Sequence, residues 1–218
     1  MDNIKVKQIT YNEAKPFIEN IHYARKMPCV QYAFGLFNSN NKIIGVVTYG
    51  QPASPSVAEG IIIDGDKHRD KILELNRLVI IVHDNKNYAS YLVSHSLRML
   101  PKNMFIVSYA DTAWGHVGYV YQATNWLYTG MTKERTDIYS ESGHARHACG
   151  DVSKRQIRSA KYRYVYLTGN KKQQLKQLKC NIIKEYPKGD SLRYDITNPI
   201  PNDKRIIKKE TSHNDLFH

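Results

Sequence analysis

The sequence predicts one mixed α/β domain within a chain of 218 residues. Two observations favour this class: short runs rich in β-branched and aromatic residues recur along the chain, and segments with helical spacing separate them. Residues 1–198 are expected to form the domain. Residues 199–218 carry proline and charge with little periodicity, so they are expected to form a flexible basic tail.

Six segments are expected to form strands, because apolar residues alternate in them or dominate them. In chain order they are 4–9, 32–38, 42–50, 74–82, 104–110 and 162–168. An Asn-rich turn separates the second from the third and predicts a hairpin. The polar stretch with Pro52, Pro55 and Gly60 is expected to be a loop.

Four segments with helical spacing are expected between these strands. They are 11–23, 87–100, 116–126 and 171–179. The second places Tyr88, Leu92 and Met99 on one face and ends at Pro101, which cannot continue a helix.

The charge balance indicates a polyanionic partner. The chain has 32 Lys and Arg against 20 Asp and Glu, which gives a net charge of +12 and favours nucleic acid. Residues 151–172 hold seven cationic residues and one acidic residue, a net charge of +6, with tyrosines between them. This stretch is either a DNA-binding face or a solvated one. Its candidate DNA contacts are Lys154, Arg155, Arg158, Lys161 and Arg163.

Several classes of protein are disfavoured. No run approaches the roughly 20 apolar residues of a spanning helix, and the first residues lack the apolar core of a signal peptide, so a soluble cytoplasmic protein is expected. The three cysteines are scattered, which argues against a disulfide scaffold. Dinucleotide-binding, P-loop, nucleophile-elbow and zincin motifs are absent from the sequence.

Asp111 is the first candidate for chemistry, because it follows an apolar run that predicts a strand. Ligands bind at the carboxyl ends of strands in α/β sheets, so Asp111 is a candidate base or metal ligand. The alternative is that Asp111 caps the helix that follows it, since Asp is a favoured capping residue.

Three other clusters leave alternatives open. His22 follows the first predicted helix, where it is either a ligand or acid/base group or a cation placed by the helix dipole. Glu74 and Arg77 interrupt an apolar strand, so they lie either at its exposed start or against a ligand. The segment 144–149 has two histidines and one cysteine but lacks the second pair of a zinc finger, which favours a solvated loop.

Separated motifs together resemble the Mom family of phage DNA-modification proteins. They cover roughly residues 15–190 and agree in order: HYARKMP (22–28), YAFGLF (32–37), ELNRLV (74–79), SYADTAWGHVGYVYQATNWLYTG (108–130) and KYRYVYLTGNKK (161–172). The resemblance implies a fold like that of the GNAT acetyltransferases, with a V-shaped mixed central sheet flanked by helices. It implies conversion of adenine N6 in double-stranded DNA to N6-(methylcarbamoyl)adenine, an acetamido-type product, which protects phage DNA from restriction.

The same resemblance implies acetyl-CoA as the acyl source and an iron centre. Mapped onto this chain, the family motifs give His22, Tyr23, Asp111 and Tyr121 as catalytic residues, with His22 and Asp111 as metal ligands or acid/base groups. Tyr121 is the candidate proton donor to a leaving thiolate. Candidate cofactor contacts are Ser96, Lys86, Asn87 and Arg77. The segment 83–90 lacks the Gly-rich turn of ordinary GNAT enzymes, so Lys86 and the amides of 87–89 would have to hold the pyrophosphate.

Two other functions stay open. One is a GNAT-like acyltransferase that acts on a protein, a small amine or another modified base. The other is a DNA-binding protein without catalysis. No membrane partner is expected, and a homodimer stays open as the assembly state.

Overall fold

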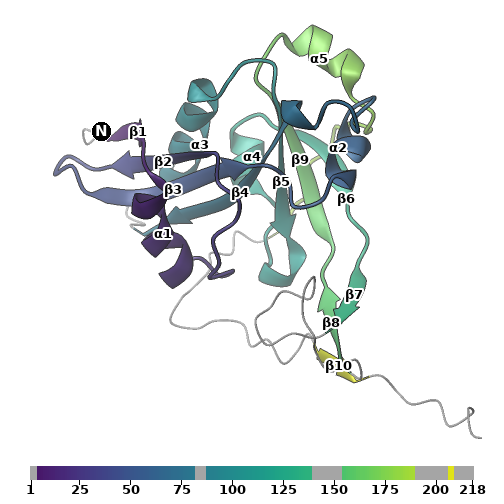
Figure 1. Ribbon diagram of the computed structural model, residues 1–218, viewed down its shortest axis with the longest axis horizontal. Coiled ribbons are helices and arrows are strands. Elements are labelled where there is room, and N and C mark those ends of the chain that lie inside the picture. The colour runs from purple at the N-terminus through teal and green to yellow at the C-terminus, as the bar shows by residue number, and fades with distance from the viewer. Residues whose placement is uncertain (1–3, 82–86, 139–153, 190–205, 209–218) are drawn as a thin grey trace, which may run out of the picture.

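The computed structural model describes residues 4–81, 87–138, 154–189 and 206–208. Seven strands form one mixed sheet in the order β1-β2-β3-β4-β5-β9-β6 (Figure 1). They are β1 (Lys5–Gln8), β2 (Tyr32–Phe37), β3 (Ile43–Gly50), β4 (Ile72–Ile80), β5 (Phe105–Asp111), β6 (Leu127–Met131) and β9 (Lys161–Leu167). All six predicted strands are therefore present.

Helices cover both faces of this sheet. The four predicted helices are α1 (Tyr11–Asn20), α3 (Tyr88–Met99), α4 (Tyr119–Ala123) and α5 (Lys171–Gln177). Thr10 begins α1 with a capping box in which its side chain accepts from the amide of Glu13 and the Glu13 carboxylate accepts in return. The expected loop between 50 and 74 is wrong in part, because it contains α2 (Ser56–Ile61). Pro55 is compatible with this helix because it stands at the N-cap, where no amide proton is needed.

The alternation of side chains along the strands explains the two-sided packing. Ala33 and Val46 face α1, whereas their neighbours Phe34 and Val47 face the cluster that includes α3. Further along the sheet, α2 covers the face that carries Phe105, Val107 and Val165, among other residues.

A second, three-stranded sheet extends away from the main body (Figure 1). It consists of β7 (Arg135–Ile138), β8 (Lys154–Arg158) and β10 (Ile206–Lys208), in the order β10-β8-β7. The sequence did not predict β6, β7 or β8. Residues 206–208 belong to the segment expected as a tail, and they pair with β8. We call β7 and β8 the β7–β8 arm.

The main sheet opens in its middle. The strands β4 and β5 are parallel and pair only from Ile72 to Glu74 against Phe105 to Val107. Beyond Glu74 they diverge, as Figure 1 shows, and the Ser108 hydroxyl donates to the Leu75 carbonyl oxygen (2.8 Å) at the point of separation. The V shape expected from the resemblance is therefore present, with Glu74 at its apex.

No helix among the described residues is long and apolar enough to cross a membrane.

Candidate active site

A cavity of about 680 Å³ lies where β4 and β5 diverge. Both strands line it, together with the start of α3, the segment that leads into α4, and the segments around β7 and β9. The fold therefore places one large cavity at the carboxyl ends of two neighbouring parallel strands, where α/β sheets bind ligands.

Glu74 lies at the apex of this cavity. Of the described residues that line the cavity, Glu74 alone carries a carboxylate, and no hydrogen bond or ion pair is found for that carboxylate among the described residues. Burial raises the pKa of Glu74, against the opposing charges of Arg77 and Lys161. A carboxylate that faces a cavity with a raised pKa is suited to general-base chemistry.

Tyr121 reaches the cavity from α4. Its hydroxyl oxygen lies 2.7 Å from the Ser108 hydroxyl, and its side chain is buried at 8% exposure. Burial raises the pKa of Tyr121 to about 12. The phenol therefore stays protonated near neutral pH and can donate a proton or a hydrogen bond.

His22 and Tyr23 also line the cavity. The Tyr23 ring lies between those of His22 (centroids 4.2 Å apart) and Trp114 (4.9 Å), with His116 at 5.9 Å. Burial, followed by the charges of Arg77 and His116, lowers the pKa of His22 to about 3. The imidazole is therefore neutral near pH 7. The Ala24 amide donates to its Nδ1 (3.0 Å), so the proton is on Nε2.

Asp111 does not line the cavity. Its Oδ1 accepts from the Ala113 amide (3.0 Å) and the Ser159 hydroxyl (2.5 Å), and its Oδ2 accepts from the Lys161 ammonium. Burial acts to raise the pKa of Asp111, but the charge of Lys161 and these hydrogen bonds hold it below its usual value. The capping alternative is present as well, because Asp111 caps the short turn Thr112–Trp114.

The residues expected to hold iron do not fit a metal. A metal-bound histidine normally donates its other ring N–H, whereas Nδ1 of His22 accepts a hydrogen bond and its Nε2 carries the proton. Both Asp111 oxygens are already occupied by N–H and O–H donors. Among the described residues, no three His, Cys, Asp or Glu side chains come together as a metal site. The segment 144–149 lies outside the described residues.

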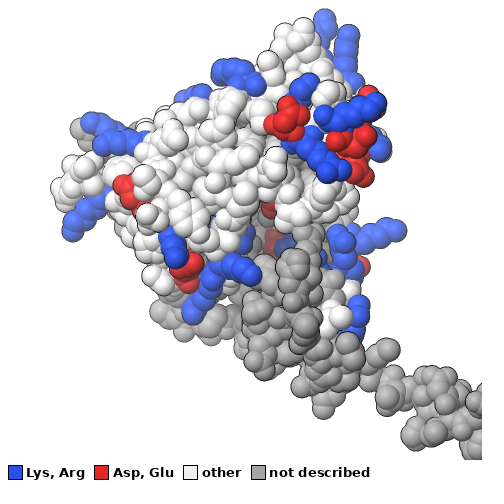
Figure 2. Space-filling model, in the orientation of Figure 1, with Lys and Arg blue, Asp and Glu red and all other residues white. Residues whose placement is uncertain are grey.

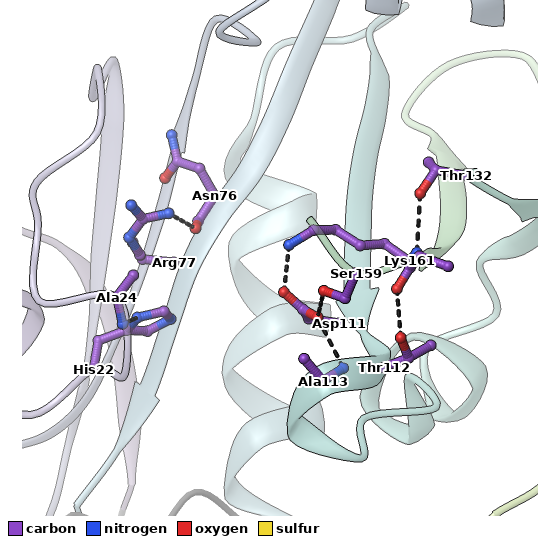
Figure 3. A network of polar contacts seen from close by, with 11 residues as sticks. His22, Ala24, Asn76, Arg77, Asp111, Thr112, Ala113, Thr132, Ser159 and Lys161 are labelled. Carbon is purple, nitrogen blue, oxygen red and sulfur yellow. Dashed lines mark hydrogen bonds and ion pairs between the residues drawn. The ribbon is translucent and has the colours of Figure 1, made fainter. Parts of the chain in front are cut away.

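The expected catalytic residues fall into separate groups. Figure 3 shows His22 and Arg77 on one side and the Asp111 network on the other. His22, Tyr23 and Tyr121 all line the cavity, and Asp111 reaches it only through Lys161.

The expected cofactor residues are also divided. Arg77 lines the cavity and donates to the Lys26 carbonyl (3.1 Å), and Asn87 lines it at the start of α3. Ser96 is fully buried in the core, where its hydroxyl contacts the Tyr49 hydroxyl (2.7 Å), and it does not line the cavity. Lys86 lies outside the described residues.

The cavity end near the β7–β8 arm is basic. Four of the five cationic side chains that line the cavity belong to this end: Lys133, Arg135, Arg158 and Lys161. Two of these, Arg158 and Lys161, were expected DNA contacts. Arg155 lies farther along the arm and donates to Thr136 (2.9 Å), Lys154 begins β8, and Arg163 donates to Thr129 (2.9 Å) away from the cavity.

Sequence reasoning missed Lys133 and Arg135, because no strand was expected there. Arg135 begins β7, whose sequence RTDI is only a weak strand signal because charged and polar residues dominate it. Charges on the face of the molecule shown in Figure 2 are distributed unevenly. Lys and Arg gather at the periphery of this face, including beside the β7–β8 arm, and the middle is largely uncharged.

Comparisons with known proteins agree with this architecture. The family model of the Mom protein family matches residues 3–188. A methylcarbamoylase named mom from Escherichia phage Mu is 27% identical over 175 residues, which cover 77% of this chain and 68% of that protein.

Solved structures show the fold. Arabidopsis thaliana NAA60, in a complex with acetyl-CoA, aligns with a TM-score of 0.51 at 12% identity over 75% of this chain and 98% of that chain. A ribosomal-protein-S5-alanine acetyltransferase from Vibrio fischeri aligns at 0.47 and 12% identity over 77% of this chain and 94% of that chain. The predicted GNAT-like fold is confirmed, and the chain is an enzyme with an acyltransferase-like fold. Since the family model spans most of the sequence, the chain belongs to the Mom protein family.

Proposed function

We propose that this enzyme modifies adenine in double-stranded DNA at N6, with a coenzyme A thioester as the acyl donor and a methylcarbamoyl-type group as the product. The observation that carries the proposal is Glu74, whose carboxylate has no hydrogen-bond partner among the described residues and lies at the junction of two chemically different cavity ends. The methylcarbamoylase activity named for the phage Mu relative supports the same reaction class.

The α3 end suits the donor. Beyond Glu74, β4 no longer pairs with β5 in the described residues, so its backbone can pair with an extended amide-bearing chain such as pantetheine. The first turn of α3 lines the cavity, and the side chain of its N-cap residue Asn87 makes no capping hydrogen bond to it. Free amides at a helix N-terminus bind pyrophosphate well. When bound there, a coenzyme A thioester supplies a carbonyl carbon that is open to attack by an amine.

The basic end suits the acceptor. Duplex DNA presents phosphates to cations, and the target base must leave the stack before an enzyme can reach its N6. Lys133, Arg135 and Arg158 can hold the strand beside the cavity. The aromatic rings of Tyr23 and His116 offer apolar surface for the base.

The chemistry needs a base and an acid. Adenine N6 is a weak nucleophile because its lone pair is delocalised into the ring. As the N6–C bond forms and the C–S bond breaks, the Glu74 carboxylate takes one proton from N6. Tyr121 holds the proton that the leaving thiolate needs. His22, which is neutral with its proton on Nε2, lines the cavity and has this N–H to offer to a bound substrate.

The two candidate products, N6-acetyladenine and N6-(methylcarbamoyl)adenine, differ by a nitrogen atom in the transferred group. An acetyl group contains no nitrogen, whereas a methylcarbamoyl group contains one. Transfer from acetyl-CoA alone would give N6-acetyladenine. Insertion of nitrogen between the acetyl carbonyl and methyl carbons also oxidises carbon by two electrons, so a methylcarbamoyl product requires a nitrogen-containing second reactant and a two-electron oxidant, or a nitrogen donor that is itself reduced. The mass of the product therefore distinguishes the two reactions.

The modification would act against restriction. Adenine N6 is a hydrogen-bond donor in the major groove, where restriction enzymes read sequence directly. A bulky substituent on N6 removes this donor and blocks the groove. We place the reaction in the host cytoplasm, where phage DNA and coenzyme A thioesters meet.

Purified protein, duplex DNA and acetyl-CoA, with and without crude cell extract that keeps its small molecules as a nitrogen source, test the proposal. Nucleosides from the DNA are then analysed by mass spectrometry, and a heavier deoxyadenosine is expected. A heavier peak on another base would change the acceptor. Acylated protein or polyamine with unmodified DNA would favour an acyltransferase with another acceptor, and DNA binding without any acylated product would favour a binding protein.

A further inference from the structure

Asp111 and Lys161 form one unit across two strands. The two residues are directly paired in the register of β5 and β9, and the buried carboxylate of Asp111 accepts from the Lys161 ammonium. The Ser159 hydroxyl (2.5 Å) and the Ala113 amide (3.0 Å) hold the other carboxylate oxygen (Figure 3). The carboxylate is therefore fixed from three directions.

The backbone around Lys161 is fixed as well. Its amide donates to the Thr132 hydroxyl (2.9 Å), and its carbonyl accepts from the Thr132 amide (2.9 Å). On the other side, the Thr112 hydroxyl donates to the Ala160 carbonyl (2.7 Å). Both the backbone of Lys161 and the ammonium at the end of its side chain are thus held in place (Figure 3).

The two members of the pair differ in access to the cavity. Asp111 is 4% exposed and does not line the cavity, whereas the Lys161 side chain is 32% exposed and lines it beside Ser159. An ammonium has three N–H donors. One is directed to Asp111, and no other acceptor within the described part of the chain is found for the remaining two.

The surroundings indicate what these donors bind. Lys133, Arg135 and Arg158 line the same end of the cavity, and no carboxylate among the described residues lines it there. Glu74 is close enough to Lys161 for the lysine charge to act on its titration. A group held by Lys161 would therefore lie next to the proposed base.

We propose that Asp111 is a positioning residue: it fixes Lys161 in the cavity, and Lys161 binds a backbone phosphate next to the target nucleotide. This assignment rests on the proposed function and replaces the catalytic or metal-binding role expected for Asp111. A purely structural residue would act on the whole fold. Asp111 would instead affect the reaction only through the position of the Lys161 side chain.

The salt dependence of DNA binding tests the Lys161 contact. Lys161→Met should lower the slope of log Kd against log salt by about 0.9, the value for one lost phosphate contact on duplex DNA. Asp111→Asn should keep the slope, because Lys161 retains its charge. Lys42→Met on the β2–β3 hairpin, far from the β7–β8 arm, is the matched charge control and should keep the slope (Figure 1).

The modification rate tests the positioning. Asp111→Asn should lower kcat roughly tenfold to a hundredfold, the cost of a displaced group at a reacting centre. Asp111→Asn combined with Lys161→Met should be no slower than Lys161→Met alone. Ser159→Ala, which loosens the carboxylate but keeps the ion pair, should give a smaller loss in the same direction.

Lys161→Arg is the conservative rescue and should keep the salt slope. Additive rate losses in the double variant, or a salt slope that Lys161→Met leaves unchanged, would overturn the inference. If Asp111→Asn does not fold, Ser159→Ala with a wild-type rate would overturn it as well. A wild-type enzyme that neither binds nor modifies DNA would instead contradict the proposed function.

Discussion

The two ends of the cavity differ in how they offer binding. The α3 end presents mainly backbone: the edge of β4 that does not pair with β5 within the described residues, and the first turn of a helix whose N-cap residue, Asn87, makes no side-chain capping hydrogen bond. The β7–β8 end presents cationic side chains, including Lys133, Arg135 and Arg158. The main sheet and α3 are therefore sufficient to form the end that is proposed to bind the acyl donor, whereas the β7–β8 arm supplies the end that is proposed to bind DNA. Glu74 lies between them, so its loss should affect chemistry without removing either end.

Glu74→Gln is expected to have the largest effect. The amide keeps the size of the side chain but cannot take a proton at neutral pH, so the modification rate should fall roughly a hundredfold or more. The rate is measured by nucleoside mass spectrometry, and DNA affinity should stay within about twofold, since no described group pairs with the carboxylate. Glu19→Gln on the exposed face of α1 is the control. A variant with the wild-type rate would remove Glu74 as the base.

The same carboxylate predicts the pH dependence of the rate. Burial raises the pKa of Glu74, so the carboxyl group is protonated and inactive at low pH. The rate should therefore rise with pH through this raised pKa and then level off. In Glu74→Gln this acidic limb should be absent from the residual rate, and an unchanged limb would assign it to another group.

Tyr121→Phe tests the donor end and should have a smaller effect. It removes one hydroxyl, so the rate should fall roughly tenfold to a hundredfold with little change in DNA affinity. Tyr166→Phe is the matched control and should keep the rate, because the Tyr166 ring packs at a tilt against Trp126 (centroids 5.6 Å apart) and does not line the cavity. Weakened DNA binding in Tyr121→Phe would place this tyrosine at the acceptor end instead.

Arg135→Met tests the acceptor end. DNA affinity should fall several-fold at low salt, and the salt slope should decrease by about one. The KM for the acyl donor should not change, because the residue lies at the β7–β8 end. A raised KM for the donor with unchanged DNA affinity would reverse the assignment of the two ends.

The burial of His22 in its neutral form predicts a small dependence of stability on pH. Its pKa is about 3 in the folded chain against 6.5 in the ordinary case, so the unfolded state binds more protons between these values. The free energy of unfolding should therefore fall as pH decreases below about 6.5, by up to about 1.4 kcal/mol per pH unit. His22→Asn should flatten this slope in urea titrations, and an equally steep slope would mean that His22 is not buried in neutral form.

The sequence predicted six of the seven strands of the main sheet and none of the strands of the second, three-stranded sheet. The strand from 42 to 50 and the helix from 87 to 100 have clear apolar periods, which packing against one core preserves. The β7 and β8 strands carry mostly charged and polar residues, because they extend from the body and bury little. Their pairing depends on long-range contacts that periodicity does not report.

The site shows the same division. His22, Tyr121 and Arg77 were found from motifs and do line the cavity. Glu74 was noted only as a polar interruption, because the divergence of β4 from β5 is a three-dimensional property. The pairing of Asp111 with Lys161 joins residues 50 positions apart, which spacing within one motif cannot indicate.

The central claim is that Glu74 catalyses modification of adenine in DNA. The most direct measurement compares nucleosides from plasmid DNA of cells that express the wild-type chain with those from cells that express Glu74→Gln at equal levels. The account predicts a deoxyadenosine heavier by a methylcarbamoyl group in the first sample and its absence in the second. Unmodified deoxyadenosine with folded wild-type protein, or equal modification by both chains, would contradict it.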